Sequence, residues 1–282
     1  MIVVGQGDEA SLRAAVTEVS QGDPRIRYIH NSLFGASSAR NTGIRAAQGD
    51  MIAFIDDDCT AQSDWLSVLG RFFDDEPRVG LVGGSVVIPA RTQSGVLVCP
   101  HVNPPETVYD PVACNYKPPA GWDWIGSNMT MRREVFTHVG LFDEVLGPGT
   151  AYPCGEDTDY KFRAEAAHVV MGTTPRAVVV HTHGIRYGLR ASLRITRNYA
   201  IGNGGFSAKL TMANDVRGVD WLHKTVRQCY NDGSRFLRPD RVLLGLRRLW
   251  YFRRAYDRLL HDYELDTEQH ILRLKNRQNS PG

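Results

Sequence analysis

The sequence lacks the features that mark several large classes of protein. Its five cysteines include no Cys-X-X-Cys pair, so we expect scattered reduced thiols rather than a disulfide framework or a zinc ribbon. No stretch approaches the roughly 18 consecutive apolar residues of a transmembrane helix. The opening Met1-Ile2-Val3-Val4 turns polar by Gln6, unlike a signal peptide. We therefore expect a globular, cytoplasmic protein without a membrane span.

The chain also has little net charge, but that sum combines two opposed parts. Its 282 residues carry a formal charge of +2. Residues 184–282 contain 19 Lys and Arg against 9 Asp and Glu, a net of +10. That leaves 14 basic and 22 acidic residues in 1–183, a net of −8. The sequence thus predicts an acidic body followed by a basic, mostly helical tail.

Short apolar runs alternate with helix-like segments through the first two thirds of the chain. Expected strands are 2–4, 26–29, 51–55, 79–88 (with a bend at Gly83-Gly84) and 177–180, and expected helices are 11–19, 36–47 (closed by Gly49), 64–73, 133–139 and 156–167. This rhythm predicts an α/β fold whose mostly parallel sheet is covered by helices. Between these elements, the Pro-rich stretch 89–119 is typical of a long loop near a binding site.

Three consecutive carboxylates, Asp56-Asp57-Asp58, follow the apolar run 51–55. Such a cluster is expected to be solvated or neutralised by a cation, and in open α/β sheets ligands bind beyond the carboxyl ends of strands. If the strand geometry continues, Asp56 and Asp58 point the same way, one toward a ribose and the other toward a metal. An acidic turn is the equally simple alternative.

Two further segments carry groups of the same chemistry. Glu156 and Asp157 stand where a Gly- and Pro-rich loop meets a helix, a position that suits either a general base or plain stabilisation of the helix start. His181 and His183 follow the apolar run 177–180 and are candidate metal ligands, although a histidine after a strand is more often a surface or packed residue.

In combination, these segments resemble the inverting family-2 nucleotide-sugar glycosyltransferases, which have the glycosyltransferase A fold. The resemblance is carried, in the family's order, by Ser37-Ser38-Ala39-Arg40-Asn41-Thr42-Gly43, Ala47-Gln48-Gly49-Asp50, Phe54-Ile55-Asp56-Asp57-Asp58, Gly126-Ser127-Asn128-Met129-Thr130-Met131-Arg132-Arg133, Gly140-Leu141-Phe142-Asp143-Glu144 and Gly155-Glu156-Asp157-Thr158-Asp159. It implies a catalytic region over 1–205, with a nucleotide-sugar part at about 1–90 and an acceptor part at about 120–205. A basic helical extension would occupy 206–282.

The resemblance implies a nucleotide-diphospho-sugar donor and a divalent metal, Mn²⁺ or Mg²⁺. Residues implied to bind the donor are Asp8, Arg40, Asp56, Asp57, Asp58 and Asn128. Asp58 would also hold the metal, together with His181 or, as the fallback, His183.

On the acceptor side, the resemblance implies that Asp157 is the catalytic base and Glu156 its neighbour. Trp122 and Trp124 would line the pocket for a saccharide or lipid-linked acceptor. The products would be the glycosylated acceptor and a nucleoside diphosphate.

Two departures from the family pattern are visible. The family's usual first strand and helix are not found before Ile2, and the strand 2–4 is followed by Asp8 rather than by a cluster of acids. Two alternatives to the transferase therefore remain open. They are a catalytically impaired nucleotide-binding protein on the same fold and a metal-dependent phosphoryl or nucleotidyl transferase.

The basic tail allows more than one interpretation. Residues 235–260 combine arginines with apolar residues such as Leu246 and Trp250 on one helical face, a pattern typical of contact with an anionic membrane surface. A helix packed on the catalytic body is the simpler alternative, and nucleic-acid binding is the least favoured. A membrane contact would make the protein peripheral at the inner face of the membrane.

Overall fold

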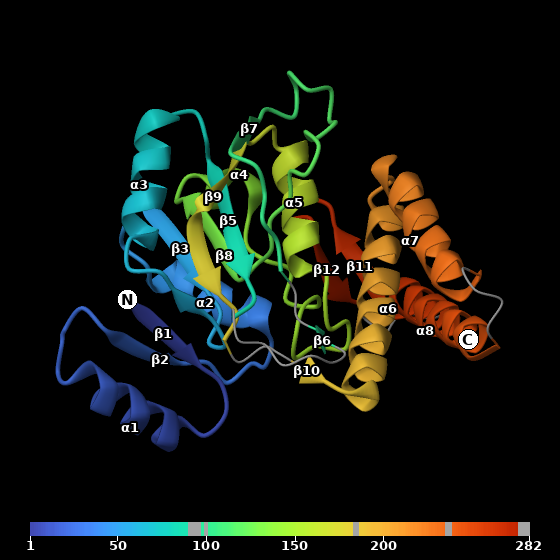
Figure 1. Cartoon of the computed structure of the whole chain (residues 1–282), viewed down its shortest axis with the longest axis horizontal. Coiled ribbons are helices and arrows are strands. Elements are labelled where there is room, and N and C mark those ends of the chain that lie inside the picture. The colour runs from blue at the N-terminus through green and yellow to red at the C-terminus, as the bar shows by residue number, and fades with distance from the viewer. Residues whose placement is uncertain (90–96, 99–100, 183–185, 235–238, 276–282) are drawn as a thin grey trace.

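The computed structural model describes residues 1–89, 97–98, 101–182, 186–234 and 239–275. Helices and strands alternate along its first two thirds, as the sequence predicts, and helices dominate the remainder (Figure 1). In chain order the elements are β1 (Ile2–Gly5), α1 (Glu9–Ser20), β2 (Arg27–His30), α2 (Ala36–Ala46), β3 (Met51–Ile55), β4 (Thr60–Ala61), α3 (Trp65–Asp75), β5 (Leu81–Val87), β6 (Leu97–Val98), β7 (Thr107–Tyr109), β8 (Asn128–Arg132), α4 (Val135–Val139), α5 (Glu156–Ala166), β9 (Met171–Val180), β10 (Arg186–Tyr187), α6 (Leu189–Met212), α7 (Arg217–Ser234), α8 (Pro239–Asp262), β11 (Tyr263–Asp266) and β12 (Ile271–Leu274).

A mixed sheet of six strands forms the centre of the molecule. Its order is β3-β8-β5-β9-β4, and β7 also pairs with β9. Only β5–β9 is parallel in this sheet, whereas β3–β8, β5–β8, β4–β9 and β7–β9 are antiparallel. The α/β class is as expected. The expectation of a mostly parallel sheet is wrong here, because β8 runs antiparallel to β3 and β5, and β4 and β7 run antiparallel to β9.

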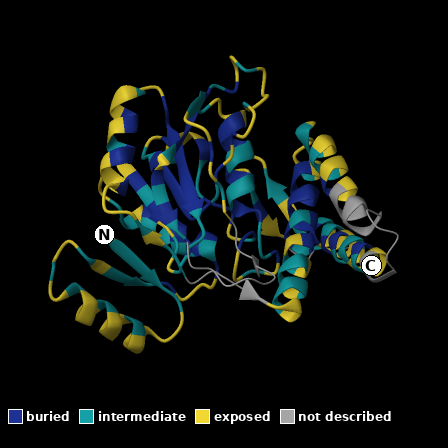
Figure 2. Ribbon diagram, viewed as in Figure 1, coloured by how far each residue is buried: buried dark blue, intermediate teal, exposed yellow. Residues whose placement is uncertain are grey.

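Two clusters of buried residues pack against this sheet. Most of the ribbon of the central sheet is coloured as buried in Figure 2. One cluster includes Phe54, Met129 and Tyr160, and the other packs Phe72 and Phe73 of α3 on the opposite side. Strand β5 changes register against β9 between Gly84 and Ser85, at the predicted bend. The sheet thus holds the ends of β3 and β9 in fixed relation to α5.

The first elements form a separate small layer. Strands β1 and β2 pair in parallel as a two-stranded sheet, and α1 has no buried residue (Figure 2). Helix α2 packs against β1. Gly49 does not cap α2, because the helix already ends at Ala46 and the Ala47 N–H donates to the carbonyls of Gly43 and Ile44.

The predicted loop 89–119 contains regular structure in its described part. Strand β7 adds to the central sheet, and Tyr109 is fully buried in the core against Trp122. The sequence did not predict this strand, because it is only three residues long and lies in a Pro-rich stretch. The segment therefore contributes to the core as well as to the surface.

The C-terminal part is built on three helices and a hairpin. Helix α8 packs along α6, α7 packs on both, and β11 pairs antiparallel with β12 (Figure 1). The expected boundary between residues 205 and 206 falls inside α6. Within the described part of the chain, we find no helix that combines the length and the apolar character needed to cross a membrane.

A buried ion network ties this part to α5. Lys209 of α6 donates to Asp143 at 2.8 Å and to Asp159 of α5 at 2.6 Å. Asp159 also accepts from Arg163 at 2.9 Å, and Asp143 accepts the N–H of Leu272 in β12. Burial alone would raise the pKa of Asp159, but Lys209 and Arg163 lower it below its usual value. The first turn of α5 is therefore held to α6 by the ion pair between Asp159 and Lys209.

Candidate active site

The three acids after β3 lie in a turn rather than on a continued strand. The Cys59 N–H donates to the Asp56 carbonyl, which closes the turn directly after Ile55. Asp56 then contacts Arg40, Asp58 contacts His181, and Asp57 is exposed. The condition under which Asp56 and Asp58 would point the same way, a strand that continues past Ile55, is therefore not met, and the two side chains contact different partners.

Arg40 of α2 joins the two acidic segments. Its Nη1 donates to Glu156 Oε1 at 2.9 Å, and its Nη2 donates to Asp56 Oδ1 at 3.1 Å. The Arg40 side chain is only 9% exposed and that of Glu156 7%, whereas Asp56 is 40% exposed. The end of β3 and the start of α5 thus meet at one guanidinium.

Burial and charge act in opposite directions on this group. Burial alone would lower the pKa of Arg40, but the carboxylates of Asp56 and Glu156 raise it above its usual value. The pKa of Glu156 is raised, first by burial and then by the nearby Asp157, despite the contact with Arg40. Glu156 is therefore suited to holding Arg40 in place rather than to exchanging protons with solvent.

Asp157 has a more open position than Glu156. It is only half-buried at the first turn of α5, and its Oδ2 accepts the N–H of Gly126 at 3.1 Å. Its Oδ1 accepts the N–H of Thr158 at 2.7 Å. These bonds fix the carboxylate beside Arg40 while leaving part of it accessible, which is what a general base requires.

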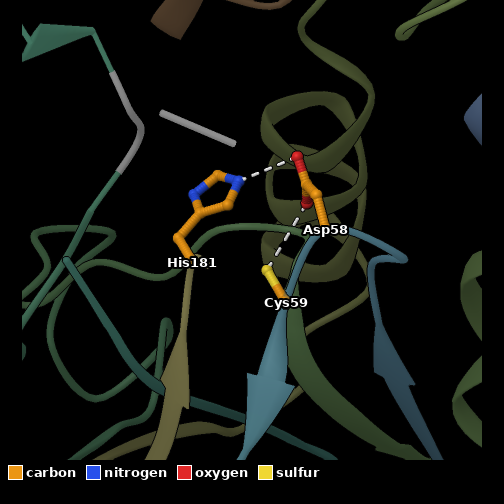
Figure 3. Close-up of side chains that lie close together, drawn as sticks. All are labelled: Asp58, Cys59 and His181. Carbon is orange, nitrogen blue, oxygen red and sulfur yellow. Dashed lines mark hydrogen bonds and ion pairs between the residues drawn. The ribbon is translucent and has the colours of Figure 1, made fainter. Parts of the chain in front are cut away.

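Asp58 and His181 meet at the ends of β3 and β9 (Figure 3). The distance from His181 Nε2 to Asp58 Oδ2 is 3.1 Å, and Cys59 Sγ lies 3.6 Å from Asp58 Oδ1. One ligand atom from each of the three residues lies within 4.8 Å of the others. The Asp58 carboxylate is a ligand that suits Mn²⁺ and Mg²⁺, whereas imidazole and thiol are softer ligands that suit metals such as Zn²⁺. The group could thus hold a divalent cation, and its donor atoms do not select one ion.

Cys59 was not recognised as part of this group from the sequence. Its position directly after Asp58 is the signal that could have found it, but a lone thiol is more often a packing residue. His183, the alternative ligand, lies outside the described residues.

Comparison with known proteins identifies the first half of the chain. Residues 1–140 match the family described as Glycosyl transferase family 2. This region belongs to glycosyl transferase family 2. The match contains β1, Arg40, the three acids after β3, Trp122 and Trp124.

Two relatives and one solved structure extend this result. The chain is 28% identical over 155 residues to the glucosyl-dolichyl phosphate glucuronosyltransferase of Haloferax volcanii, covering 52% of this chain and 47% of that protein. It is 31% identical over 172 residues to the pre-mycofactocin glycosyltransferase of Mycobacterium tuberculosis, covering 55% and 31%. The chain thus spans less than half the length of these relatives.

The fold is also that of a solved glycosyltransferase. The mannosyltransferase PcManGT of Pyrobaculum calidifontis superimposes with a TM-score of 0.54 at 15% identity, covering 93% of this chain and 77% of that one. The glycosyltransferase A fold expected from the motifs is therefore confirmed.

Two residues that the sequence predicts to bind a donor have other partners in the structure. The Asp8 carboxylate accepts the N–H of Ser11 and caps α1, and no described contact joins it to Arg40. Asn128 is fully buried, and its Nδ2 donates to the carbonyls of Ser85 and Ala177, both at 2.8 Å. Its Oδ1 accepts from an indole N–H, so the Asn128 amide holds the sheet together.

The tryptophans expected to line the acceptor pocket lie in the core. Trp122 is 7% exposed and Trp124 is 1% exposed. The Lys161 ammonium lies 5.5 and 5.0 Å from the two ring centroids and pairs with Asp123. Covered in this way, neither ring offers an open face on which an acceptor could stack.

Proposed function

We propose that this chain is a metal-dependent, inverting glycosyltransferase that uses a nucleotide-diphospho-sugar donor. The observation that carries the proposal is the bridge from Asp56 through Arg40 to Glu156, with Asp157 beside it. It joins the acids after β3 to the acids at the start of α5. The family match and the fold support the same conclusion.

The donor would bind at the ends of β3 and β9. Arg40 and Asp56 would face the nucleotide, and Asp58 and His181 would hold the divalent cation. A bound cation supplies positive charge next to the diphosphate that leaves. PcManGT, which has the same fold, was solved in complex with GDP-Man and Mn²⁺.

The acceptor would react at the other end of the site. Its hydroxyl oxygen attacks the anomeric carbon while the bond from that carbon to the diphosphate oxygen breaks. The bonding electrons leave with the diphosphate, and Asp157 takes the hydroxyl proton. A single displacement of this kind inverts the anomeric configuration. Glu156 keeps Arg40 in position and is a positioning residue.

Turnover of a panel of nucleotide-sugars, measured with Mn²⁺ and with a chelator, tests the proposal. We expect Mn²⁺-dependent turnover in the wild type and a loss of about 10²–10⁴-fold in Asp157→Asn, the usual contribution of a general base. The matched control is Asp220→Asn, an exposed charge on α7, which should retain full turnover.

The other outcomes separate the alternatives. Nucleotide binding without turnover in the wild type would contradict the proposal and indicate a nucleotide-binding protein. Phosphate or nucleotide transfer without sugar transfer would indicate a phosphoryl or nucleotidyl transferase. Undiminished turnover in Asp157→Asn would remove Asp157 as the base.

A further inference from the structure

A cleft separate from the Arg40 group lies between α6 and α8. It encloses about 480 Å³ and is closed on one side by Ala151 and Tyr152, in the loop that precedes α5. Three arginines and three aromatic residues dominate its wall: Arg197, Arg254, Arg258, Tyr152, Trp250 and Tyr251. Its chemistry is thus both cationic and aromatic.

Two of the three arginines carry uncompensated charge. Arg258 lies 3.3 Å from Asp262, whereas Arg197 and Arg254 have no carboxylate partner within the described part of the chain. Each of the two instead lies 5.2 Å from an aromatic ring centroid, that of Tyr251 for Arg197 and that of Trp250 for Arg254. Two guanidinium groups without a carboxylate partner that line one cleft favour a phosphate over a neutral ligand.

An apolar stripe leads away from the cleft along α8. Leu243, Leu246 and Trp250 are 69%, 59% and 53% exposed, and their spacing of three and four residues places them on one helical face. Ile201 and Ala255 add apolar wall inside the cleft. Exposed apolar residues that continue a cationic cleft indicate a ligand with a charged head and a hydrocarbon chain.

We infer that this cleft binds the phosphate of an amphiphilic phosphate ester, with the hydrocarbon chain along α8. If the proposed function holds, this ester carries the acceptor hydroxyl, so the acceptor class would be a phosphate-linked lipid. A close contact links the helix that lines the cleft to the loop before α5. Gly202 of α6 packs so closely on Cys154 that an added Cβ would lie 2.1 Å from its Sγ, and Glu156 follows two residues later.

Calorimetric titration of the full chain with octyl phosphate tests this inference. Inorganic phosphate and octyl glucoside serve as the reference ligands. We expect octyl phosphate to bind at least about tenfold more tightly than inorganic phosphate, because several methylene groups become buried. The neutral glucoside should bind weakly. Equal affinity for inorganic phosphate would indicate a simple anion site, and equal affinity for the glucoside an unspecific apolar groove. Either result would overturn the inference.

Matched double variants locate the site. R197Q/R254Q should weaken octyl phosphate binding by about tenfold or more, since charge-assisted hydrogen bonds are lost. R190Q/R194Q removes two exposed charges from the same part of α6 outside the cleft and should leave the affinity unchanged. If both variants weaken octyl phosphate binding equally, the loss follows from net charge alone, and the assignment of the site to this cleft is wrong.

A second variant keeps the test independent of folding defects. Trp250→Ala changes a half-exposed side chain and should weaken octyl phosphate but not inorganic phosphate. Unfolding midpoints are measured for every variant. If Trp250→Ala leaves octyl phosphate affinity unchanged, the chain does not run along α8.

Failure here is distinguishable from failure of the proposed function. Nucleotide-sugar turnover without octyl phosphate binding would overturn the cleft and leave the transferase intact. Octyl phosphate binding without any turnover would support the cleft as a binding site and overturn its assignment to an acceptor.

Discussion

Removing the Arg40 side chain should destabilise the protein strongly and in a pH-dependent manner. In Arg40→Met, Glu156 stays buried but loses the guanidinium that lies 2.9 Å from its carboxylate. Breaking a buried pair by removing one partner typically costs about 3–5 kcal/mol. The contact with Asp56 adds about 1 kcal/mol at most because that carboxylate is 40% exposed. We therefore expect a loss of about 3–6 kcal/mol at neutral pH.

The pH dependence follows from the pKa of Glu156. Burial already raises this pKa, and loss of Arg40 raises it further because the guanidinium acts to lower it. The folded variant then holds a proton that the unfolded chain releases, so stability falls as the pH rises. The penalty should be smallest in acid. It should grow as the pH passes from the pKa of Glu156 in the wild type through the higher value in the variant.

Urea unfolding followed by circular dichroism at several pH values between about 5 and 8 measures this effect. Arg45→Met is the matched control, since Arg45 is exposed on the same helix. Combining Arg40→Met with Glu156→Gln should recover about 2 kcal/mol, because no buried charge remains unpaired. The reasoning is refuted if Arg40→Met costs no more than the control, or if Glu156→Gln recovers nothing.

Two further predictions concern the scaffold. Gly84→Ala would place a Cβ 2.3 Å from the Ala177 carbonyl oxygen and should cost about 3 kcal/mol or prevent folding. Gly70→Ala, in open space on α3, should instead raise the unfolding free energy by up to about 1 kcal/mol. Lys209→Met leaves Asp159 with one cationic partner fewer and should cost about 3 kcal/mol or more at neutral pH. The loss should shrink in acid, because removing Lys209 raises the pKa of Asp159; a pH-independent loss in urea unfolding would contradict this.

The order of elements was largely predictable from the sequence, whereas strand pairing was not. Apolar runs and helix-like spacing located β1, α2, β3 and α5, because local periodicity reports which residues are buried. It does not report which strand lies beside which. The antiparallel β8 between β3 and β5 therefore went unpredicted, as did the short strand β7.

The candidate site was predictable in its residue types but not in its contacts. The motifs pointed to Asp58 and His181 as ligands of one metal, and these two side chains lie in contact. The motifs also pointed to Arg40, but its contacts with Asp56 and Glu156 were not expected. Asn128 and Trp124 also belong to segments that resemble the family. In the structure, however, the Asn128 amide bonds to the backbone of the sheet and Trp124 packs in the core. Sequence order cannot separate these roles, because exposure depends on the three-dimensional neighbours.

The basic tail also shows that the sequence predicts residue pattern but not which side chains become buried. The amphipathic pattern predicted either a packed helix or an exposed apolar face, and α8 has both. Phe252, Ala255 and Leu259 are buried, whereas Leu246 and Trp250 are exposed. A helix can present different faces along its length, and composition averaged over 24 residues hides the change.

Calorimetric binding of nucleoside diphosphates in Mn²⁺ tests the central claim most directly. The claim is that Asp58 and Asp157 are the donor end and the base end of one transfer site. It predicts that Asp58→Asn loses Mn²⁺-dependent binding while Asp157→Asn retains it, even though Asp157→Asn loses turnover. Unchanged binding in Asp58→Asn, or equal loss of binding in both variants, would contradict the account.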